Sequence, residues 1–106
     1  MDRENGGIIG KYEYMMERIE TTISGRVQGV MYRDFACRKG RSLELSGEAQ
    51  NMPDGTVRVI AEGERSSLEA FVKKLEKGSF LSSVETVVVV WRPASGAYRG
   101  FSITYA

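Results

Sequence analysis

Histidine is absent from this sequence of 106 residues, and cysteine occurs once, at Cys37. The absence of histidine excludes Ser-His-Asp and Cys-His catalysis, histidine-ligated zinc and any histidine pH switch. A single cysteine excludes a disulfide within the chain and a metal site built from several cysteines. An enzyme of this composition must therefore act without the side chain that most often serves as a general base.

Neither sign of charge is in clear excess. The sequence contains 15 lysines and arginines and 14 aspartates and glutamates, which gives a net charge of +1. A nucleic-acid-binding domain usually has a strong basic excess. The longest apolar run near the start is the pair Ile8-Ile9, which is too short for a signal peptide or a membrane span. We therefore expect a cytoplasmic protein with a reduced Cys37 that binds neither nucleic acid nor a membrane. Its small size and near-neutral charge fit a monomer.

The length suits one domain, because domains of roughly 100–150 residues are the most common. Residues 1–18 contain polar and glycine-rich stretches without clear periodicity, which predicts a flexible N-terminal extension. The pattern becomes regular at residue 19, so residues 19–106 are expected to form the folded domain.

Hydrophobic periodicity predicts the secondary structure of this domain. The expected strands lie near residues 19–27, 45–51, 56–61, 84–91 and 101–105, and the expected helices near 31–42 and 66–77. The sequence Pro53-Asp54-Gly55 predicts a turn that joins two strands into a hairpin. Ser66 or Ser67 is expected to cap the second helix, and Gly78 to end it. The valine-rich run at 84–91 predicts a strand with much of both faces covered.

The order of these elements is β-α-β-β-α-β, followed by an added C-terminal strand. This order predicts an α+β fold of the ferredoxin-like type. We expect a sandwich in which two helices cover one face of an antiparallel sheet.

The segment Gly25-Arg-Val-Gln-Gly-Val-Met-Tyr-Arg33 lies where the first strand ends and the first helix begins. Such a junction offers unpaired backbone N–H groups, and the helix dipole adds positive potential. Arg33 falls in the first helical turn, and a guanidinium binds phosphate oxygens in a bidentate manner. The segment therefore predicts an oxyanion site. The alternative is a plain strand-to-helix turn with a surface arginine.

Asn51 is the second candidate, because it ends the strand before the Pro-Asp-Gly turn. A neutral amide can accept a hydrogen bond from a water molecule and donate one to it. It can orient that water without placing a carboxylate beside an anionic substrate. The alternative is an asparagine that satisfies its own turn backbone.

These residues resemble a known family. Residues 25–33 are similar to the phosphate-loop signature of acylphosphatases. Residues 46–59, followed by Gly63, are similar to the second signature of that family, and the ending Gly100-Phe-Ser-Ile fits its usual last strand. The resemblance covers residues 19–106 and includes two motifs in the right order and spacing.

The resemblance implies hydrolysis of the carboxyl–phosphate bond of a small acyl phosphate, without a metal or an organic cofactor. It assigns the phosphate-binding role to Arg33 and the positioning of the attacking water to Asn51. Backbone N–H groups of the loop complete the phosphate site, and they belong to Gln28, Gly29, Val30 and Met31. The leaving carboxylate has a pKa near ~4 and departs without a general acid. We hypothesise that the substrate phosphate itself takes the proton of the attacking water.

Two positions depart from the family pattern. Glu48 stands where an aromatic residue is usual, and Glu44 stands where glycine is common. Glu48 would repel an anionic substrate if it pointed into the site. The alternative function is therefore a module that binds phosphate or carbamoyl phosphate without turnover. An RNA-binding ferredoxin-like domain is disfavoured, because its central strands would expose paired aromatic residues.

Overall fold

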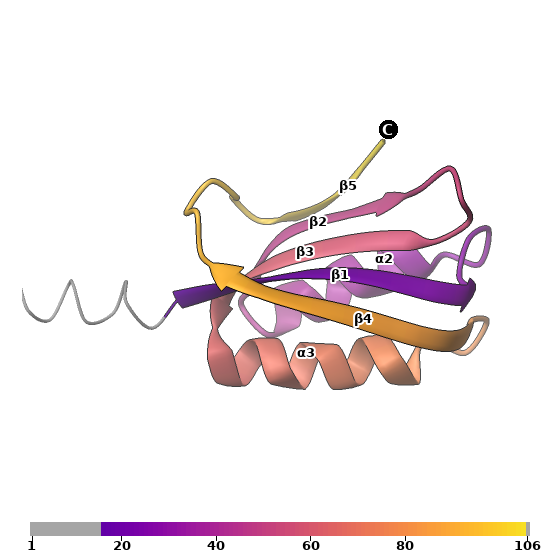
Figure 1. Cartoon of the computed structure of the whole chain (residues 1–106), viewed down its shortest axis with the longest axis horizontal. Helices are drawn as coiled ribbons and strands as arrows, with labels where there is room; N and C mark the ends of the chain where they lie inside the picture. The colour runs from indigo at the N-terminus through magenta and orange to yellow at the C-terminus, as the bar shows by residue number, and fades with distance from the viewer. Residues whose placement is uncertain (1–15, 106) are drawn as a thin grey trace, which may run out of the picture.

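The structure is a computed structural model, and it describes residues 16–105 of the chain. It contains, in order, β1 (Met16–Arg26), α2 (Tyr32–Ser42), β2 (Ser46–Asn51), β3 (Val57–Glu64), α3 (Arg65–Lys77), β4 (Ser83–Pro93) and β5 (Phe101–Thr104). This is the predicted order, and the ferredoxin-like α+β fold with an added strand is confirmed (Figure 1). Of the predicted N-terminal extension, residues 1–15 lie outside the described residues. Residues 16–18 belong to β1.

The five strands form one sheet in the order β4-β1-β3-β2-β5. Strands β4, β1, β3 and β2 pair with one another in antiparallel fashion, but β5 pairs with β2 in parallel. The prediction of an antiparallel sheet is therefore wrong at this edge, and the sheet is mixed. The reason is the connection through residues 94–100, which carries the chain from β4 at one edge to β5 at the other (Figure 1).

Both helices pack on the same face of the sheet, as predicted. Helix α3 contacts β1, β3 and β4, while α2 contacts β2, β3 and β5. Between helices and sheet lies the hydrophobic core, which includes Ile19 and Ile23 of β1, Val59 of β3, and Leu68 and Phe71 of α3. Burial of these side chains, each worth roughly 1.5–3 kcal/mol, stabilises the layered arrangement.

The valine run forms an edge strand, so the prediction that both of its faces are covered is wrong. Val87 and Val89 pack against the core, whereas Val88 and Val90 are 58% and 42% exposed. The cause is that both helices cover the same face of the sheet, which leaves the opposite face of β4 open to solvent. Within residues 16–105, no helix is long and apolar enough to cross a membrane.

The ends of α3 only partly follow the sequence prediction. Gly78 ends the helix with a φ of 75°, as expected. The N-cap is Glu64, without a side-chain cap hydrogen bond, so the predicted Ser66 or Ser67 cap is wrong. The reason is that β3 runs directly into α3 and leaves no loop in which a serine could cap the helix.

Candidate active site

The loop between β1 and α2 turns sharply through left-handed backbone conformations. Gly29 has a φ of 75°, and Met31, the N-cap of α2, has a φ of 62°. Within residues 16–105, the backbone N–H groups of residues 28–31 donate no hydrogen bond. Four free N–H groups beside a helix N-terminus form a site suited to an anion.

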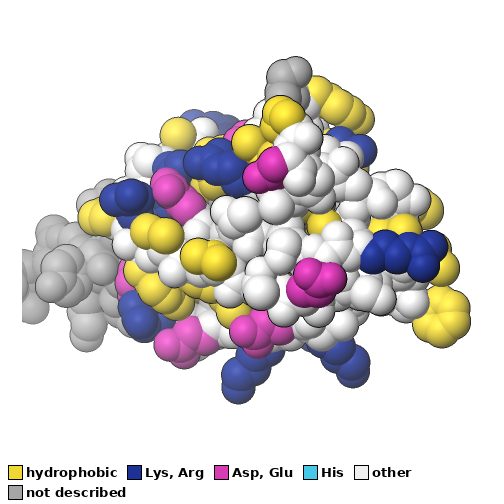
Figure 2. Space-filling view, turned by 45° about the vertical axis from the view of Figure 1, so that its right-hand side comes forward, with side chains coloured by type: hydrophobic (Ala, Val, Ile, Leu, Met, Phe, Trp, Pro, Cys, Tyr) yellow, Lys and Arg dark blue, Asp and Glu magenta, His cyan; other side chains and the backbone are white. Residues whose placement is uncertain are grey.

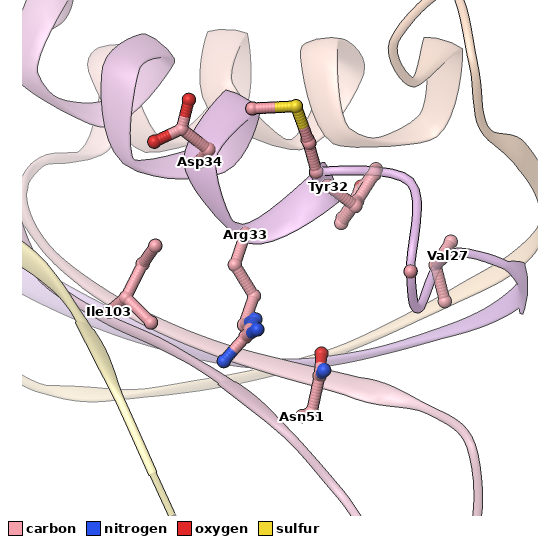
Figure 3. Close-up of a pocket in the computed structure, with 8 residues that line it drawn as sticks. Val27, Tyr32, Arg33, Asp34, Asn51 and Ile103 are labelled. Carbon is pink, nitrogen blue, oxygen red and sulfur yellow. The ribbon is translucent and has the colours of Figure 1, made fainter.

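This loop borders a cleft of about 380 Å³. The cleft is lined by Val27, Gly29, Met31, Tyr32, Arg33, Asp34, Asn51 and Ile103. The structure thus brings together the two predicted catalytic residues, Arg33 and Asn51, with two of the predicted loop residues, Gly29 and Met31. Figure 3 shows the Arg33 side chain extending from α2 toward the sheet, between Ile103 and Asn51.

The other two predicted loop residues place their side chains outside this cleft. The Gln28 side-chain Nε2 donates hydrogen bonds of 2.8 Å to the backbone carbonyls of Met52 and Thr56. Val30 packs against the hydrophobic core. Gln28 therefore ties the loop to the hairpin that carries Asn51, a contact that no sequence pattern indicates.

Asn51 is the last residue of β2 and pairs with Val57 of β3. Side chains two positions apart on a strand share a face, so Asn51 lies on the helix-covered face with the buried Ala49. The Asn51 Oδ1 atom is buried and has no hydrogen-bond partner among the described residues. A buried amide oxygen without a partner costs about 1–3 kcal/mol, so this position favours a water molecule or a ligand.

The Arg33 guanidinium lies over the ring of Tyr105, with its central carbon 5.3 Å from the ring centroid. Within residues 16–105, no carboxylate forms an ion pair with Arg33. Sequence analysis missed Tyr105 as part of the site. Tyr105 ends the segment in which Phe101, Ile103 and Tyr105 alternate with polar residues. That alternation predicts a strand, but it does not indicate which residue of α2 the Tyr105 ring contacts.

The two departures from the family pattern lie away from the cleft. Glu48 pairs with Ile60 and lies on the sheet face opposite to the helices, so its carboxylate does not point toward Asn51. Glu44 is exposed in the turn between α2 and β2, where its φ is 60°. Neither carboxylate therefore lies beside the anion that the loop is suited to bind.

Cys37 and Tyr32 are buried and support the start of α2. Burial raises the pKa of the Cys37 thiol, which therefore stays protonated and packs as a small apolar side chain. Burial also raises the pKa of Tyr32, whose hydroxyl donates a 2.8 Å hydrogen bond to the Leu75 carbonyl. This bond holds the first turn of α2 against the last turns of α3.

Comparison with known proteins agrees with this geometry. The family model described as Acylphosphatase matches residues 19–103. An acylphosphatase of Thermus thermophilus is 47% identical over 88 residues, which are 83% of this chain and 99% of that protein. An acylphosphatase of Salinibacter ruber is 40% identical over 82% of this chain and 92% of its own length.

A solved structure is similar over the same region. The crystal structure of acylphosphatase from Bacillus subtilis superposes with a TM-score of 0.81 at 32% sequence identity. The superposition covers 84% of this chain and 99% of the other. A family match over most of the chain, close relatives and a shared fold lead to one conclusion: the chain belongs to the acylphosphatase family.

Proposed function

We propose that the chain hydrolyses the carboxyl–phosphate bond of small acyl phosphates, with Arg33 binding the phosphate and Asn51 holding the attacking water. Membership of the acylphosphatase family supports this class of reaction. The cleft between the loop and β2 supports the assignment of roles, because it contains an arginine, a free amide oxygen and loop N–H groups.

The observation that carries the proposal is the buried Oδ1 of Asn51, which has no partner among residues 16–105 although it lines the same cleft as Arg33. A water molecule that donates one hydrogen to this oxygen keeps its lone pairs free to attack phosphorus. An amide also adds no negative charge beside the anionic substrate.

The reaction needs little covalent chemistry from the protein. The oxygen of the water bonds to phosphorus, and the bond between phosphorus and the acyl oxygen breaks, with its electron pair leaving on the carboxylate. Loop N–H groups and the Arg33 guanidinium stabilise the charge on the phosphoryl oxygens during this exchange. Positioning and charge stabilisation are the main contributions in phosphoryl transfer.

We infer that the proton of the water passes to a phosphoryl oxygen of the substrate. The acidic side chain that lines the cleft is Asp34, and it points away from the sheet that carries Asn51 (Figure 3). It also lies 3.7 Å from the guanidinium Nε of Arg38. A pH profile of kcat that requires a protein base with a pKa near neutrality would contradict this route.

The test is phosphate release from benzoyl phosphate in the presence of EDTA, since we propose a reaction without a metal. Arg33→Ala is expected to lower kcat/KM by about two to three orders of magnitude, because it removes a donor to the transition state. Asn51→Ala is expected to lower kcat by a similar factor and to leave the affinity for inorganic phosphate nearly unchanged.

Matched controls lie on the opposite face of the sheet. Arg58 alternates with the buried Val57 and Val59, so its side chain lies on the face opposite to the helices. Gln50 precedes Asn51 on β2 and pairs with Arg58, so it lies on this same outward face. Arg58→Ala and Gln50→Ala are expected to retain activity within about twofold. A folded wild type that binds phosphate without turnover would support a binding module instead.

A further inference from the structure

The loop between α3 and β4 ends in a tight turn with two large apolar residues at its tip. The Ser82 N–H donates to the Ser79 carbonyl over 3.2 Å. The Ser79 N–H in turn donates to the Ser82 hydroxyl over 2.8 Å. The two residues between them, Phe80 and Leu81, are 101% and 56% exposed. Hydrogen bonds thus fix a turn whose tip presents an apolar surface to solvent.

This composition is unusual for an exposed turn. Glycine, proline, asparagine, aspartate and serine dominate turns, because their local conformations or side-chain hydrogen bonds suit them. Phe80 and Leu81 supply neither advantage, and their exposure leaves apolar area in contact with water. Their exposure leaves an apolar surface that is available for contact with a ligand.

The turn faces the phosphate-binding loop across a second hollow of about 350 Å³. This hollow is lined by Val30, Met31, Asp34, Phe35, Arg38, Ser79, Phe80 and Leu81. Figure 2 shows apolar side chains projecting at the right-hand end of the molecule, where Figure 1 places the loop before α2 and the loop before β4. Met31 and Asp34 line both this hollow and the cleft of Arg33 and Asn51, so the two spaces adjoin at these residues.

We propose that Met31, Phe80 and Leu81 form an acyl surface that binds the carboxylic part of the substrate and selects apolar acyl groups. The proposal rests on the proposed function, because it assigns the second half of the same substrate. Met31 is 69% exposed and lines both spaces. The acyl group of a substrate whose phosphate binds the loop would leave the cleft beside this side chain.

The geometry of an in-line displacement supports this placement. The attacking and leaving oxygens lie on opposite sides of phosphorus. With the water held at Asn51 on the sheet, the acyl oxygen leaves on the side away from the sheet. Asp34, which lines both spaces, is on that side of α2 (Figure 3). The leaving carboxylate therefore departs toward the hollow that Phe80 and Leu81 border.

The charges around the hollow refine the substrate class. The Asp34 carboxylate and the Arg38 guanidinium lie 3.7 Å apart on its border and largely balance each other. Among the described residues that line the hollow, no net positive charge is thus left to attract an acyl group with a second carboxylate. We therefore expect neutral apolar acyl groups to be preferred over anionic ones.

The test compares benzoyl phosphate with acetyl phosphate in the wild type and in the double variant Phe80→Ser/Leu81→Ser. Loss of roughly 50 Å² of apolar contact, at about 25 cal/mol/Å², corresponds to a loss of about eightfold. We expect the ratio of kcat/KM for benzoyl over acetyl phosphate to fall about five- to tenfold in the double variant. Intrinsic differences in reactivity cancel, because the same two substrates are used throughout.

The matched control is Val88→Ser/Val90→Ser, which removes two exposed apolar side chains from the open face of β4. It is expected to leave the ratio unchanged. Binding of phenylphosphonate and methylphosphonate, measured by calorimetry, gives a readout that does not depend on turnover. The wild type should bind the phenyl compound more tightly, and the Phe80→Ser/Leu81→Ser variant should lose that preference.

The outcomes separate this inference from the proposed function. Hydrolysis of both substrates with a ratio that the Phe80→Ser/Leu81→Ser variant does not change would overturn the acyl surface and leave the hydrolase intact. Absence of hydrolysis in the wild type, with a phenyl preference that this variant abolishes, would overturn the proposed function and retain the acyl surface.

Discussion

The guanidinium of Arg33 lies over the ring of Tyr105, with 5.3 Å between its central carbon and the ring centroid. The first residue comes from α2 and the second follows β5 at the far edge of the sheet. A cation over an aromatic face is attracted by about 0.5–1 kcal/mol at exposed sites. The ring therefore restrains the guanidinium beside the cleft.

Tyr105→Ala is expected to lower kcat/KM for benzoyl phosphate about two- to fivefold, because the guanidinium loses this restraint. Tyr105→Phe keeps the ring and should behave like the wild type. Steady-state kinetics of the three proteins check the prediction. Equal losses in both variants would assign the effect to the hydroxyl and contradict a role for the ring.

Gln28 is expected to act as a positioning residue between the loop and the hairpin. Gln28→Ala removes two hydrogen bonds and should lower the free energy of unfolding by about 1–2 kcal/mol. It should also lower kcat about tenfold, because the loop shifts relative to Asn51 and small displacements are costly in phosphoryl transfer. Urea unfolding and steady-state kinetics measure the two effects.

Gln28→Glu is a sharper version of the same test. It keeps the size of the side chain but turns a carboxylate oxygen toward the Met52 and Thr56 carbonyls, which only accept hydrogen bonds. We expect it to be at least as damaging as Gln28→Ala. A Gln28→Glu variant with wild-type kcat would show that these hydrogen bonds do not position the loop.

Glu62 is expected to make the stability of the protein depend on pH. Burial raises the pKa of its carboxyl group, but hydrogen bonds from Ser95 and Gly96 and the charge of Arg18 outweigh this effect and lower the pKa overall. A carboxyl group with a lowered pKa stabilises the fold above its unfolded value of about 4.3. That contribution is lost as the pH falls through the folded pKa.

Glu62→Gln should therefore lower the free energy of unfolding by about 1–3 kcal/mol at pH 7, with a smaller difference from the wild type at pH 3. Urea unfolding at the two pH values measures this change. Glu69→Gln, on the exposed surface of α3, is the control and should change little at either pH. A Glu62→Gln effect of equal size at both pH values would contradict the electrostatic explanation.

Glu44→Gly is expected to stabilise the protein by about 0.5–1 kcal/mol. Glu44 has a φ of 60°, a left-handed conformation that costs a residue with a Cβ roughly 1–2 kcal/mol, and glycine adopts it without this cost. The larger chain entropy of unfolded glycine offsets part of the gain. Glu69→Gly in the middle of α3 should instead destabilise by about 1 kcal/mol, and thermal unfolding distinguishes the two signs.

The sequence alone predicted the elements that depend on local patterns. Alternation in β1 and the i, i+3, i+4 spacing of Leu68, Phe71 and Val72 arise from backbone geometry within one element, and the structure contains both elements. The order of the elements then favoured one fold class. The loop signature and the position of Asn51 before a turn pointed to residues that the structure places in one cleft.

Tertiary structure decided everything that depends on which distant segments meet. It paired β5 in parallel with β2, left Val88 and Val90 on an open face, and turned Glu48 away from the cleft. It also placed Tyr105 beside Arg33. Hydrophobic periodicity records that a face is apolar but not what covers it, because pairing and packing are set by contacts between residues far apart in the chain. The candidate site therefore consists of residues predicted locally and of contacts that only the complete fold creates.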